Sequence, residues 1–326
     1  MGIFRTVIEP HKAPFNIKHS HKLLFLGSCF SENIGAFLIN RKFDVDLNPF
    51  GVIFNPASIK KSLEFLIEEK VLSENELFYH NEQWHSFYHH TRFSGNDKES
   101  CLTGINQRMV SATRNLKKAD FLFLTFGTSV IFRSVETGEV VSNCHKLPAS
   151  KFINELLTSE LIVAEYNELF GKLKKINPGI KIILTISPVR HLGNGVAGNQ
   201  LSKAILVVSA HELCKHPDVY YFPAYELLLD DLRDYRFYDE DMVHPSKQAV
   251  EYIINFFSSS YFDKNTLRLN EQVEKIISAY NHRPVRPQSD SYRQFCRQAL
   301  EDISVIEKDN PTLDFSFEKM HFRKFL

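Results

Sequence analysis

The 326-residue sequence lacks long hydrophobic runs, has few cysteines and carries no excess of charge of either sign. No segment approaches the roughly 18 consecutive apolar residues that a membrane-spanning helix needs. Lysine plus arginine and aspartate plus glutamate number 39 each, so the formal net charge is zero. A balanced charge gives no long-range attraction to nucleic acid or to anionic membranes. We therefore expect neither a nucleic-acid partner nor a membrane partner.

The five cysteines are odd in number, lie far apart and include no Cys-x-x-Cys pair. This usage argues against a disulfide framework or a zinc knuckle, and it is typical of a reducing compartment. The first residues contain neither an apolar run of signal-peptide length nor a small-residue cleavage site. We expect a cytoplasmic protein, and no pattern in the sequence indicates its oligomeric state.

Short apolar runs predict four buried strands, at residues 22–27, 120–127, 181–188 and 219–222. Each run is continuous rather than alternating in polarity, which is typical of parallel strands covered on both faces. Helical apolar spacing appears between and after them, at residues 31–41, 56–67, 104–118, 160–176, 200–215 and 246–261. The segment 130–141 predicts a hairpin, and 72–100 looks irregular. This alternation predicts an α/β fold with a parallel sheet and helices on both faces.

The last part of the chain differs in character from the rest. Residues 263–326 contain two helical stretches around a proline-rich joint at 283–287. We therefore predict an α/β domain over residues 1–262 and a helical C-terminal extension over 263–326.

Functional sites in open α/β sheets lie beyond the carboxyl ends of the strands. Three segments occupy such positions, at residues 27–29, 127–129 and 187–191. Ser31 would cap the helix after the first strand. A cysteine at this strand-to-helix turn lies near free N–H groups, so we expect a lowered pKa for Cys29. The alternative is that Cys29 is a small buried residue packed under the helix.

A second motif places Asp241 three positions before His244, with Pro245 directly after it. In a tight turn this spacing lets the carboxylate orient and stabilise the imidazole. The imidazole could then act as a base toward a nucleophile and as an acid toward a leaving group. The alternative is a surface turn capped by Asp241 with an incidental histidine.

Together these motifs resemble the GSCFA family, a branch of the SGNH (GDSL-like) hydrolase superfamily. The resemblance extends over residues 20–262 and rests on the segments 26–31, 48–56, 143–146, 187–191 and 241–245. It implies a flavodoxin-like three-layer sandwich. It also implies a nucleophile after the first strand, glycine and asparagine donors for an oxyanion, and a C-terminal Asp-x-x-His pair.

Matched by position, Cys29 stands where the superfamily has its nucleophilic serine, and Ser28 stands where it has the preceding aspartate. Ser28 remains an alternative nucleophile. Asp241 and His244 match the C-terminal pair directly. Gly51 is the candidate for the oxyanion glycine.

The segment around Gly127 departs from the superfamily pattern, because Ser129 stands where an asparagine is expected. Losing one oxyanion donor costs on the order of 10²–10³ in rate. Asn55, Ser129 or His145 would have to replace it. A cysteine nucleophile would form a thioester, which can pass its acyl group to another acceptor as readily as to water.

Four further residues are candidates for contact with a substrate. Trp84 and His89 belong to an aromatic segment that could line a groove for a sugar ring. A metal held by His85 and His89 is disfavoured, because no acidic cluster accompanies them. Arg190 and His191 follow the third strand and could hold an anionic part of the substrate, or they could form a structural ion pair.

The sequence thus predicts an esterase-like acyl hydrolase or acyltransferase that acts on a small O-acyl group, such as acetyl on a carbohydrate. Cys29 or Ser28 would attack, His244 would move the proton, and Asp241 would orient His244. No metal or organic cofactor is needed. The alternative is a catalytically weak or inactive protein of the same fold that binds a glycan or a protein partner.

Overall fold

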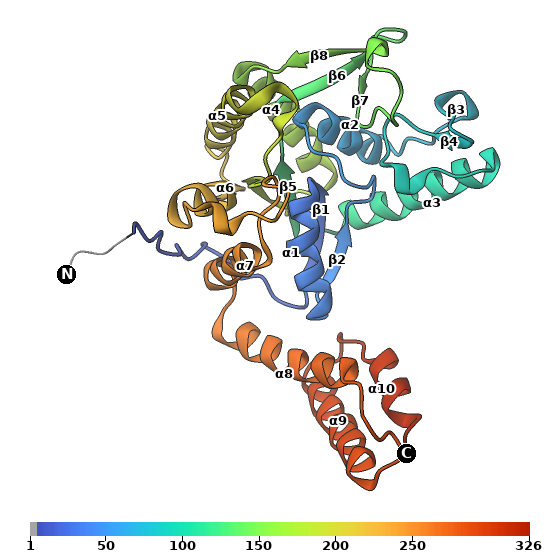
Figure 1. The fold of residues 1–326 in the computed structure, drawn as a ribbon, viewed down its shortest axis with the longest axis vertical. Helices are drawn as coiled ribbons and strands as arrows, with labels where there is room; N and C mark the ends of the chain where they lie inside the picture. The colour runs from blue at the N-terminus through green and yellow to red at the C-terminus, as the bar shows by residue number, and fades with distance from the viewer. Residues whose placement is uncertain (1–4) are drawn as a thin grey trace. The chain divides into compact units, whose positions relative to one another are not determined.

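The computed structural model describes residues 5–326, which form two compact units (Figure 1). The first unit comprises residues 5–9, 22–35 and 45–255, and the second comprises residues 10–21, 36–44 and 256–326. The second unit therefore contains two N-proximal segments as well as the C-terminal helices. The domain division at residue 262 stays a prediction. No helix within residues 5–326 is both long and apolar enough to cross a membrane.

The first unit is built on a five-stranded sheet whose order is β10-β9-β5-β1-β2. Counted along the chain, this order is 2-1-3-4-5, which is the flavodoxin-like order. The strands are β1 (Lys22–Gly27), β2 (Asp44–Leu47), β5 (Phe121–Phe126), β9 (Lys181–Ile186) and β10 (Val219–Phe222). The pairs β1–β5, β5–β9 and β9–β10 are parallel. The four predicted strands are confirmed, whereas the edge strand β2 was not predicted.

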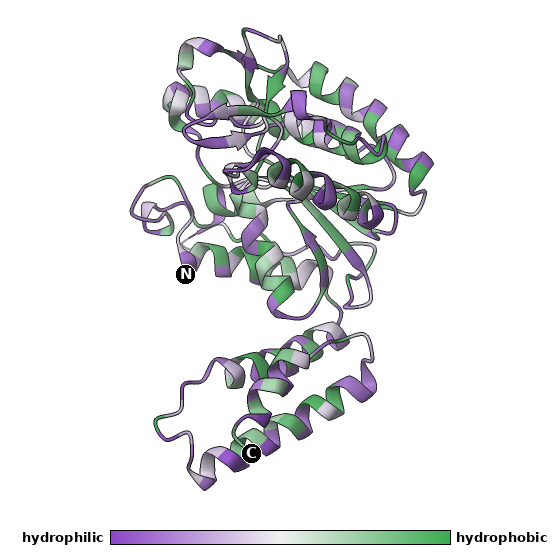
Figure 2. Ribbon diagram, turned by 90° about the vertical axis from the view of Figure 1, so that its right-hand side faces the viewer, coloured by the Kyte–Doolittle hydropathy of each residue, from purple (hydrophilic) through white to green (hydrophobic). Residues whose placement is uncertain are grey.

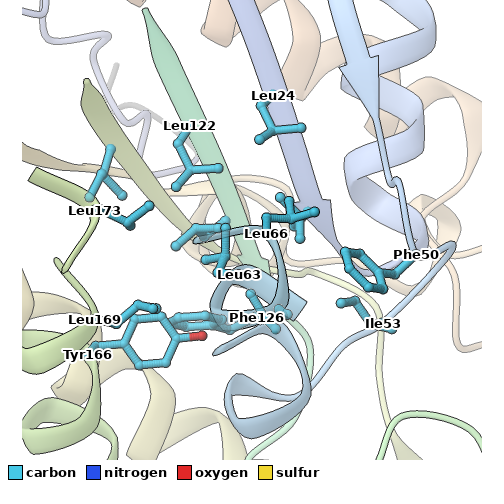
Figure 3. Close-up of a cluster of buried hydrophobic side chains, with 14 of the residues drawn as sticks. Leu24, Phe50, Ile53, Leu63, Leu66, Leu122, Phe126, Tyr166, Leu169 and Leu173 are labelled. Carbon is cyan, nitrogen blue, oxygen red and sulfur yellow. The ribbon is translucent and has the colours of Figure 1, made fainter. Parts of the chain in front are cut away.

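One face of the sheet packs against four helices through a continuous hydrophobic core. The helices are α2 (Pro56–Ile67), α3 (Lys98–Leu116), α4 (Ser159–Ile176) and α5 (Gly195–Leu213). Alternate strand residues such as Leu24 and Leu122 point to this face, as the pleat requires. Figure 3 shows Tyr166 beside Phe126, and their rings meet edge to face at 5.1 Å. The Tyr166 hydroxyl donates to the carbonyl of Pro56 at 2.9 Å.

The opposite face carries the other alternating set, in which the rings of Phe25 and Phe123 stack at 4.1 Å. Helix α1 (Cys29–Asn40) packs closely beside β2, because a Cβ on Gly35 would lie 2.5 Å from the Leu47 side chain. Helix α7 (Lys247–Tyr261) begins shortly after His244. The α/β fold with a central parallel sheet between helical layers is thus confirmed.

Two small antiparallel sheets accompany the main sheet. The predicted hairpin forms β6 (Val130–Ser134) and β7 (Val140–Val141), and β8 (Phe152–Leu156) adds a third strand on the other side of β6. The segment predicted to be irregular contains the hairpin β3 (Phe78–His80) and β4 (Gln83–His85). Its two linking residues have φ values of 45° and 61°, as a tight primed turn requires.

The C-terminal helices of the second unit are α8 (Lys264–Asn281), α9 (Asp290–Asp309) and α10 (Ser316–Arg323). Buried residues recur in α9 at intervals of three and four, at Tyr292, Cys296, Ala299, Ile303 and Ile306. In Figure 2 the helices carry hydrophobic and hydrophilic residues in alternation along their length, as amphipathic helices do. The predicted C-terminal helical extension is confirmed.

Candidate active site

The candidate site lies where the strand order of the main sheet reverses, between β1 and β5. Ligands of such sheets bind outside the carboxyl ends of the strands at this switch point. Gly27 pairs in register with Thr125, and the N–H of Ser28 donates to the carbonyl of Thr125 at 3.2 Å. Cys29 and Gly127 therefore follow two adjacent strand ends.

The turn after β1 requires a glycine because two backbones approach closely. A Cβ on Gly27 would lie 2.6 Å from the carbonyl oxygen of Thr125. The N–H of Gly27 donates to the Oδ1 atom of Asn48 at 3.0 Å, so a buried side chain also holds the turn. Any larger residue at position 27 would push Cys29 away from this edge of the sheet.

Helix α1 begins at Cys29, two residues earlier than predicted, so the expectation that Ser31 caps it is wrong. Ser28 occupies the capping position. Its hydroxyl accepts the N–H of Phe30 at 3.3 Å, and its carbonyl accepts the N–H of Ser31 at 2.9 Å. Ser28 is buried, whereas Cys29 is partly exposed. The serine hydroxyl thus serves the helix, and the thiol beside it faces the site.

The thiol of Cys29 does not have the lowered pKa that its helix N-terminus predicts. Burial raises its pKa, and the nearby charge of Glu32 raises it further. The N–H groups of Cys29 and Phe30 and the charge of Lys203 act in the opposite direction, but they do not overcome the burial. The expectation of a depressed pKa is therefore wrong, because desolvation outweighs the helix terminus.

Asp241 and His244 form the pair that their spacing predicts. The Oδ2 atom of Asp241 lies 2.6 Å from the Nδ1 atom of His244. The Oδ1 atom accepts the N–H groups of Val243 at 2.8 Å and of His244 at 2.9 Å. The N–H groups and imidazole around Asp241 lower its pKa to about 2. One carboxylate therefore both shapes the turn and orients the imidazole. The other ring nitrogen of His244, Nε2, has no hydrogen-bond partner within residues 5–326.

Arg190 braces this turn from the end of β9. Its N–H donates to the carbonyl of Val243 at 3.1 Å, and its Nη1 atom donates to the carbonyl of Met242 at 2.9 Å. Its guanidinium lies 5.6 Å from the centre of the Tyr238 ring. In the described part of the chain it has no carboxylate partner, so the ion-pair alternative is not realised.

His191 lies against the strand end at Gly127. A Cβ on Gly127 would be 2.8 Å from the Nε2 atom of His191, and the imidazole packs on the Phe54 ring at 5.0 Å. This Nε2 atom is buried without a hydrogen-bond partner in the described chain. Burial lowers the pKa of His191 to about 3, with further contributions from the charges of Lys203 and His244. His191 is thus a neutral side chain, and the charge of His244 is one of the causes of its lowered pKa.

A loop at residues 51–55 crosses the ends of β1 and β5. The N–H of Ile53 donates to the carbonyl of Gly27 at 3.1 Å, and the N–H of Gly127 donates to the carbonyl of Phe54 at 2.6 Å. The N–H of Gly51 donates to the carbonyl of Asn48 at 2.8 Å. The assignment of Gly51 as an oxyanion donor is therefore not supported, because a turn already uses its N–H.

Two of the three predicted substitutes for the missing asparagine are engaged elsewhere. Ser129 is fully buried, and both its N–H and its hydroxyl contact the Ser202 hydroxyl, at 2.7 Å and 3.1 Å. His145 is also buried, with its Nε2 atom 2.9 Å from the carbonyl of Ser86. Asn55 caps α2 through Oδ1, which accepts the N–H of Ser58 at 2.8 Å. Its Nδ2 group has no partner among residues 5–326.

The aromatic segment at 78–93 forms packed structure around its histidines. His89 is buried, its ring stacks on Phe50 at 4.8 Å, and burial lowers its pKa to about 3. A substrate-lining role for His89 is not supported by this position. Trp84 is half-buried on β4, with the Lys98 ammonium 4.9 Å from its ring. In His85, Nδ1 lies 2.6 Å from the Ser94 hydroxyl and Nε2 lies 2.9 Å from the carbonyl of His80.

The sequence analysis missed Lys203, which lies on α5 beneath the site. Its side chain is buried, and its Nζ atom donates to the carbonyls of Gly127 at 2.5 Å and Ser187 at 2.6 Å. Burial lowers its pKa to about 7, and the charge of Cys29 partly opposes that shift. One signal was present, because position 203 falls on the same helix face as the buried residues Asn199 and Leu206.

A groove of about 280 Å³ opens beside the Asp241–His244 turn. Its lining includes Arg190, three tyrosines and two amide side chains. These side chains are Tyr225, Tyr235, Tyr238, Asn199 and Gln200. The groove thus offers aromatic faces, amides and the guanidinium of Arg190, which also donates to the carbonyl of Met242 in the turn.

Solved structures to which this chain is similar include three esterases. A carbohydrate esterase family 3 protein from Talaromyces cellulolyticus is 10% identical, with a TM-score of 0.36 over 77% of this chain and 98% of its own. A serine-to-alanine mutant of an acetyl esterase with acetate ion is 11% identical, with a TM-score of 0.37 over 78% and 99%. An acetyl xylan esterase from Butyrivibrio proteoclasticus is 11% identical, with a TM-score of 0.34 over 74% and 64%.

Comparison with curated proteins gives no match. The sequence model of the GSCFA family matches residues 22–257, which contain every residue of the candidate site described above. A second model, described as the GSCFA domain protein C-terminal domain, matches residues 273–326. The chain belongs to the GSCFA family.

Proposed function

We propose that the protein is an SGNH-type acyl hydrolase or acyltransferase with a cysteine nucleophile. The observation that carries the proposal is the 2.6 Å contact between Asp241 and the Nδ1 atom of His244, which leaves Nε2 free to accept a proton. The position of Cys29 at the switch point of the sheet supports it. The charge of Lys203 acts on both Cys29 and His191, and the charge of His244 also acts on His191.

The chemistry follows from the protonated resting state of the thiol. The Sγ atom of Cys29 attacks the acyl carbon while the Nε2 atom of His244 accepts the thiol proton. The C–O bond of the ester breaks, and the leaving alcohol takes the proton from the imidazolium. Water or a second alcohol then attacks the thioester, with His244 again accepting a proton. The attack of this water or alcohol releases the acyl group as an acid or as a new ester. The leaving thiolate takes the proton from the imidazolium of His244, which restores the thiol.

Two donors are our candidates to stabilise the oxyanion that forms during attack. Cys29 is the first residue of α1, so its N–H has no acceptor within the helix. The Nδ2 group of Asn55 is the second, because its Oδ1 already caps α2 and the loop before it contacts Gly127 through Phe54. This pair replaces the assignment that gave the role to Gly51.

The proposed substrate is a small O-acyl ester, such as acetyl on a carbohydrate. The tyrosine-lined groove that contains Arg190 is large enough for one sugar ring, and its amides and guanidinium match hydroxyl groups. The acyl group would lie toward Cys29 and the alcohol toward Tyr238. A cytoplasmic location stays a prediction.

A second candidate is a carbohydrate-binding protein of this fold without appreciable turnover. The engaged N–H of Gly51 and the buried hydroxyl of Ser129 favour it, because both stand at oxyanion positions of the superfamily. In that case the groove would bind a glycan, and the Asp241–His244 pair would serve the turn.

Turnover of 4-nitrophenyl acetate and of an acetylated monosaccharide by matched variants distinguishes these candidates. Cys29→Ala should abolish turnover and leave thermal stability nearly unchanged. Ser28→Ala should retain turnover but lose about 0.5–2 kcal/mol of stability, because it removes the cap of α1. Loss of activity only in the Ser28 variant would assign the nucleophile to Ser28. Binding of the deacetylated sugar with no turnover by the wild type would support the binding protein instead.

A further inference from the structure

Lys203 carries a buried amino group without the partner that such a group normally has. Its side chain is fully buried, and no carboxylate within residues 5–326 forms an ion pair with its Nζ atom. Transfer of an ammonium group from water into a protein interior is costly unless it is paired. Among residues 5–326, only two backbone carbonyls, those of Gly127 and Ser187, accept its hydrogen bonds. The position is therefore costly to stability, which suggests a role in the site.

The two carbonyls place this amino group at the catalytic edge of the sheet. Gly127 follows β5 and Ser187 follows β9, so the Nζ atom lies at the carboxyl ends of two neighbouring strands. Cys29 follows β1, which is the other neighbour of β5. The backbone bond from Ser28 to Thr125 fixes β1 and β5 in register at this level. The residue that carries the thiol, Cys29, and the carbonyls that hold the amino group of Lys203 thus follow the ends of neighbouring strands.

We propose that Lys203 is a positioning residue of the site, whose buried ammonium group stabilises the thiolate of Cys29. The inference rests on the proposed function, in which Cys29 is the nucleophile. The N–H groups at the start of α1 do not offset the effect of burial on the thiolate. The ammonium group of Lys203 adds a positive charge that also favours the thiolate. In a site without an asparagine after β5, it also places a cation at the strand ends where negative charge would develop.

Other charged groups near Cys29 and Lys203 also affect the pKa of the Cys29 thiol. Glu32 lies on α1 and opposes Lys203, because its carboxylate raises the pKa of Cys29. Arg92 pairs with Glu32 at 3.2 Å. His191 is kept neutral partly by Lys203 itself, and the Tyr225 ring centre lies 5.5 Å from the Nζ atom. The pKa of Cys29 should therefore reflect the opposing effects of Lys203, which lowers it, and Glu32, which raises it.

The test measures the alkylation rate of Cys29 by iodoacetamide from pH 6 to pH 10. Peptide mass spectrometry follows Cys29 and the other four cysteines in the same sample. Lys203→Met should slow the alkylation of Cys29 about ten-fold at low pH, since one unit of pKa is a factor of ten. The difference should shrink above pH 7, because the pKa of Lys203 is lowered to about 7 and its charge is lost there. Lys215→Met, at an exposed lysine that pairs with Glu212, is the control and should match the wild type.

A purely structural role for Lys203 would give a pH-independent change in rate, and this result would overturn the inference. If the Met variant does not fold, the reciprocal measurement remains. In protein labelled with ¹³C at lysine Cε, the titration midpoint of Lys203 should be higher in Cys29→Asp than in Cys29→Ala, since a fixed negative charge at position 29 favours the ammonium as a thiolate would and linkage is mutual. Equal midpoints in the two variants would refute the coupling. Coupling without ester turnover would leave this inference standing while the proposed function fails, and turnover without coupling would do the reverse.

Discussion

Replacing Asp241 by asparagine changes one hydrogen-bonding atom of the site and preserves the shape of the turn. The Oδ1 atom of Asp241 accepts the N–H groups of Val243 and His244, and an asparagine carbonyl can keep both bonds. The Oδ2 atom faces the Nδ1 atom of His244 at 2.6 Å, and asparagine would place an NH₂ group there. An NH₂ group only donates, so Nδ1 must accept and the imidazole proton moves to Nε2.

With the proton on Nε2, His244 could not accept the thiol proton of Cys29 as the proposed mechanism requires. In a hydrolytic triad with a buried aspartate the same substitution lowers turnover by about 10⁴. Here the side chains of His244 and Asp241 are 49% and 50% exposed, so water can partly stabilise the productive tautomer. We therefore expect a smaller loss, on the order of 10²–10³ in turnover. The midpoint of thermal unfolding should change by less than about 2 °C.

Thermal unfolding and hydrolysis of 4-nitrophenyl acetate are measured on the same preparation. Asp241→Ala is the matched control, because it removes the turn bonds as well as the orienting bond. It should lose activity to a similar extent and also lower the unfolding midpoint by about 2–4 °C. An Asp241→Asn variant that is destabilised but fully active would refute the reasoning. Asp241 would then be a turn cap, and the mechanism would reduce to a dyad of Cys29 and His244.

Three further predictions concern the thiol and its surroundings. Because burial raises the pKa of Cys29, its alkylation rate should still be rising above pH 9, and a plateau near pH 7 would contradict this. Glu32→Gln should increase alkylation at pH 8 by about two- to five-fold, as removal of one partly screened charge allows; an unchanged rate would exclude an effect of Glu32. Gly127→Ala should lower stability by about 1–3 kcal/mol, because its Cβ would meet Phe54 at 2.9 Å, whereas Gly104→Ala in α3 should be neutral or stabilising in thermal unfolding.

The interior strands could be predicted from sequence because burial on both faces leaves a continuous apolar run. β1, β5 and β9 are such runs, and their ends locate the switch point of the sheet. The edge strand β2 has the sequence Asp-Val-Asp-Leu and is partly exposed, so its composition gives no such signal. β8 pairs only with β6 at the edge of a small sheet and is also largely exposed. Edge strands depend on tertiary pairing, which a single sequence does not display.

In the candidate site, too, local features could be predicted from sequence, whereas features that depend on tertiary contacts could not. The Asp241–His244 pair is a local turn, so its spacing alone predicts its geometry. The N–H of Gly51 could not be assigned from sequence, because its acceptor belongs to a turn whose form depends on packing against His90. Lys203 lies far along the chain from Cys29, and only the order of the strands brings their elements together. The local motif therefore predicts the Asp241–His244 pair, whereas the charges that act on Cys29 depend on the fold.

This electrostatic setting favours one form of cysteine chemistry over another. A thiol with a depressed pKa rests as a thiolate and reacts with many electrophiles. Burial and Glu32 instead hold Cys29 in its protonated form. Attack then requires a base at the moment of reaction, which is the role that the free Nε2 atom of His244 can fill. In the proposed mechanism, the same raised pKa that contradicts the expectation of a resting thiolate thus makes the Asp241–His244 pair necessary for turnover.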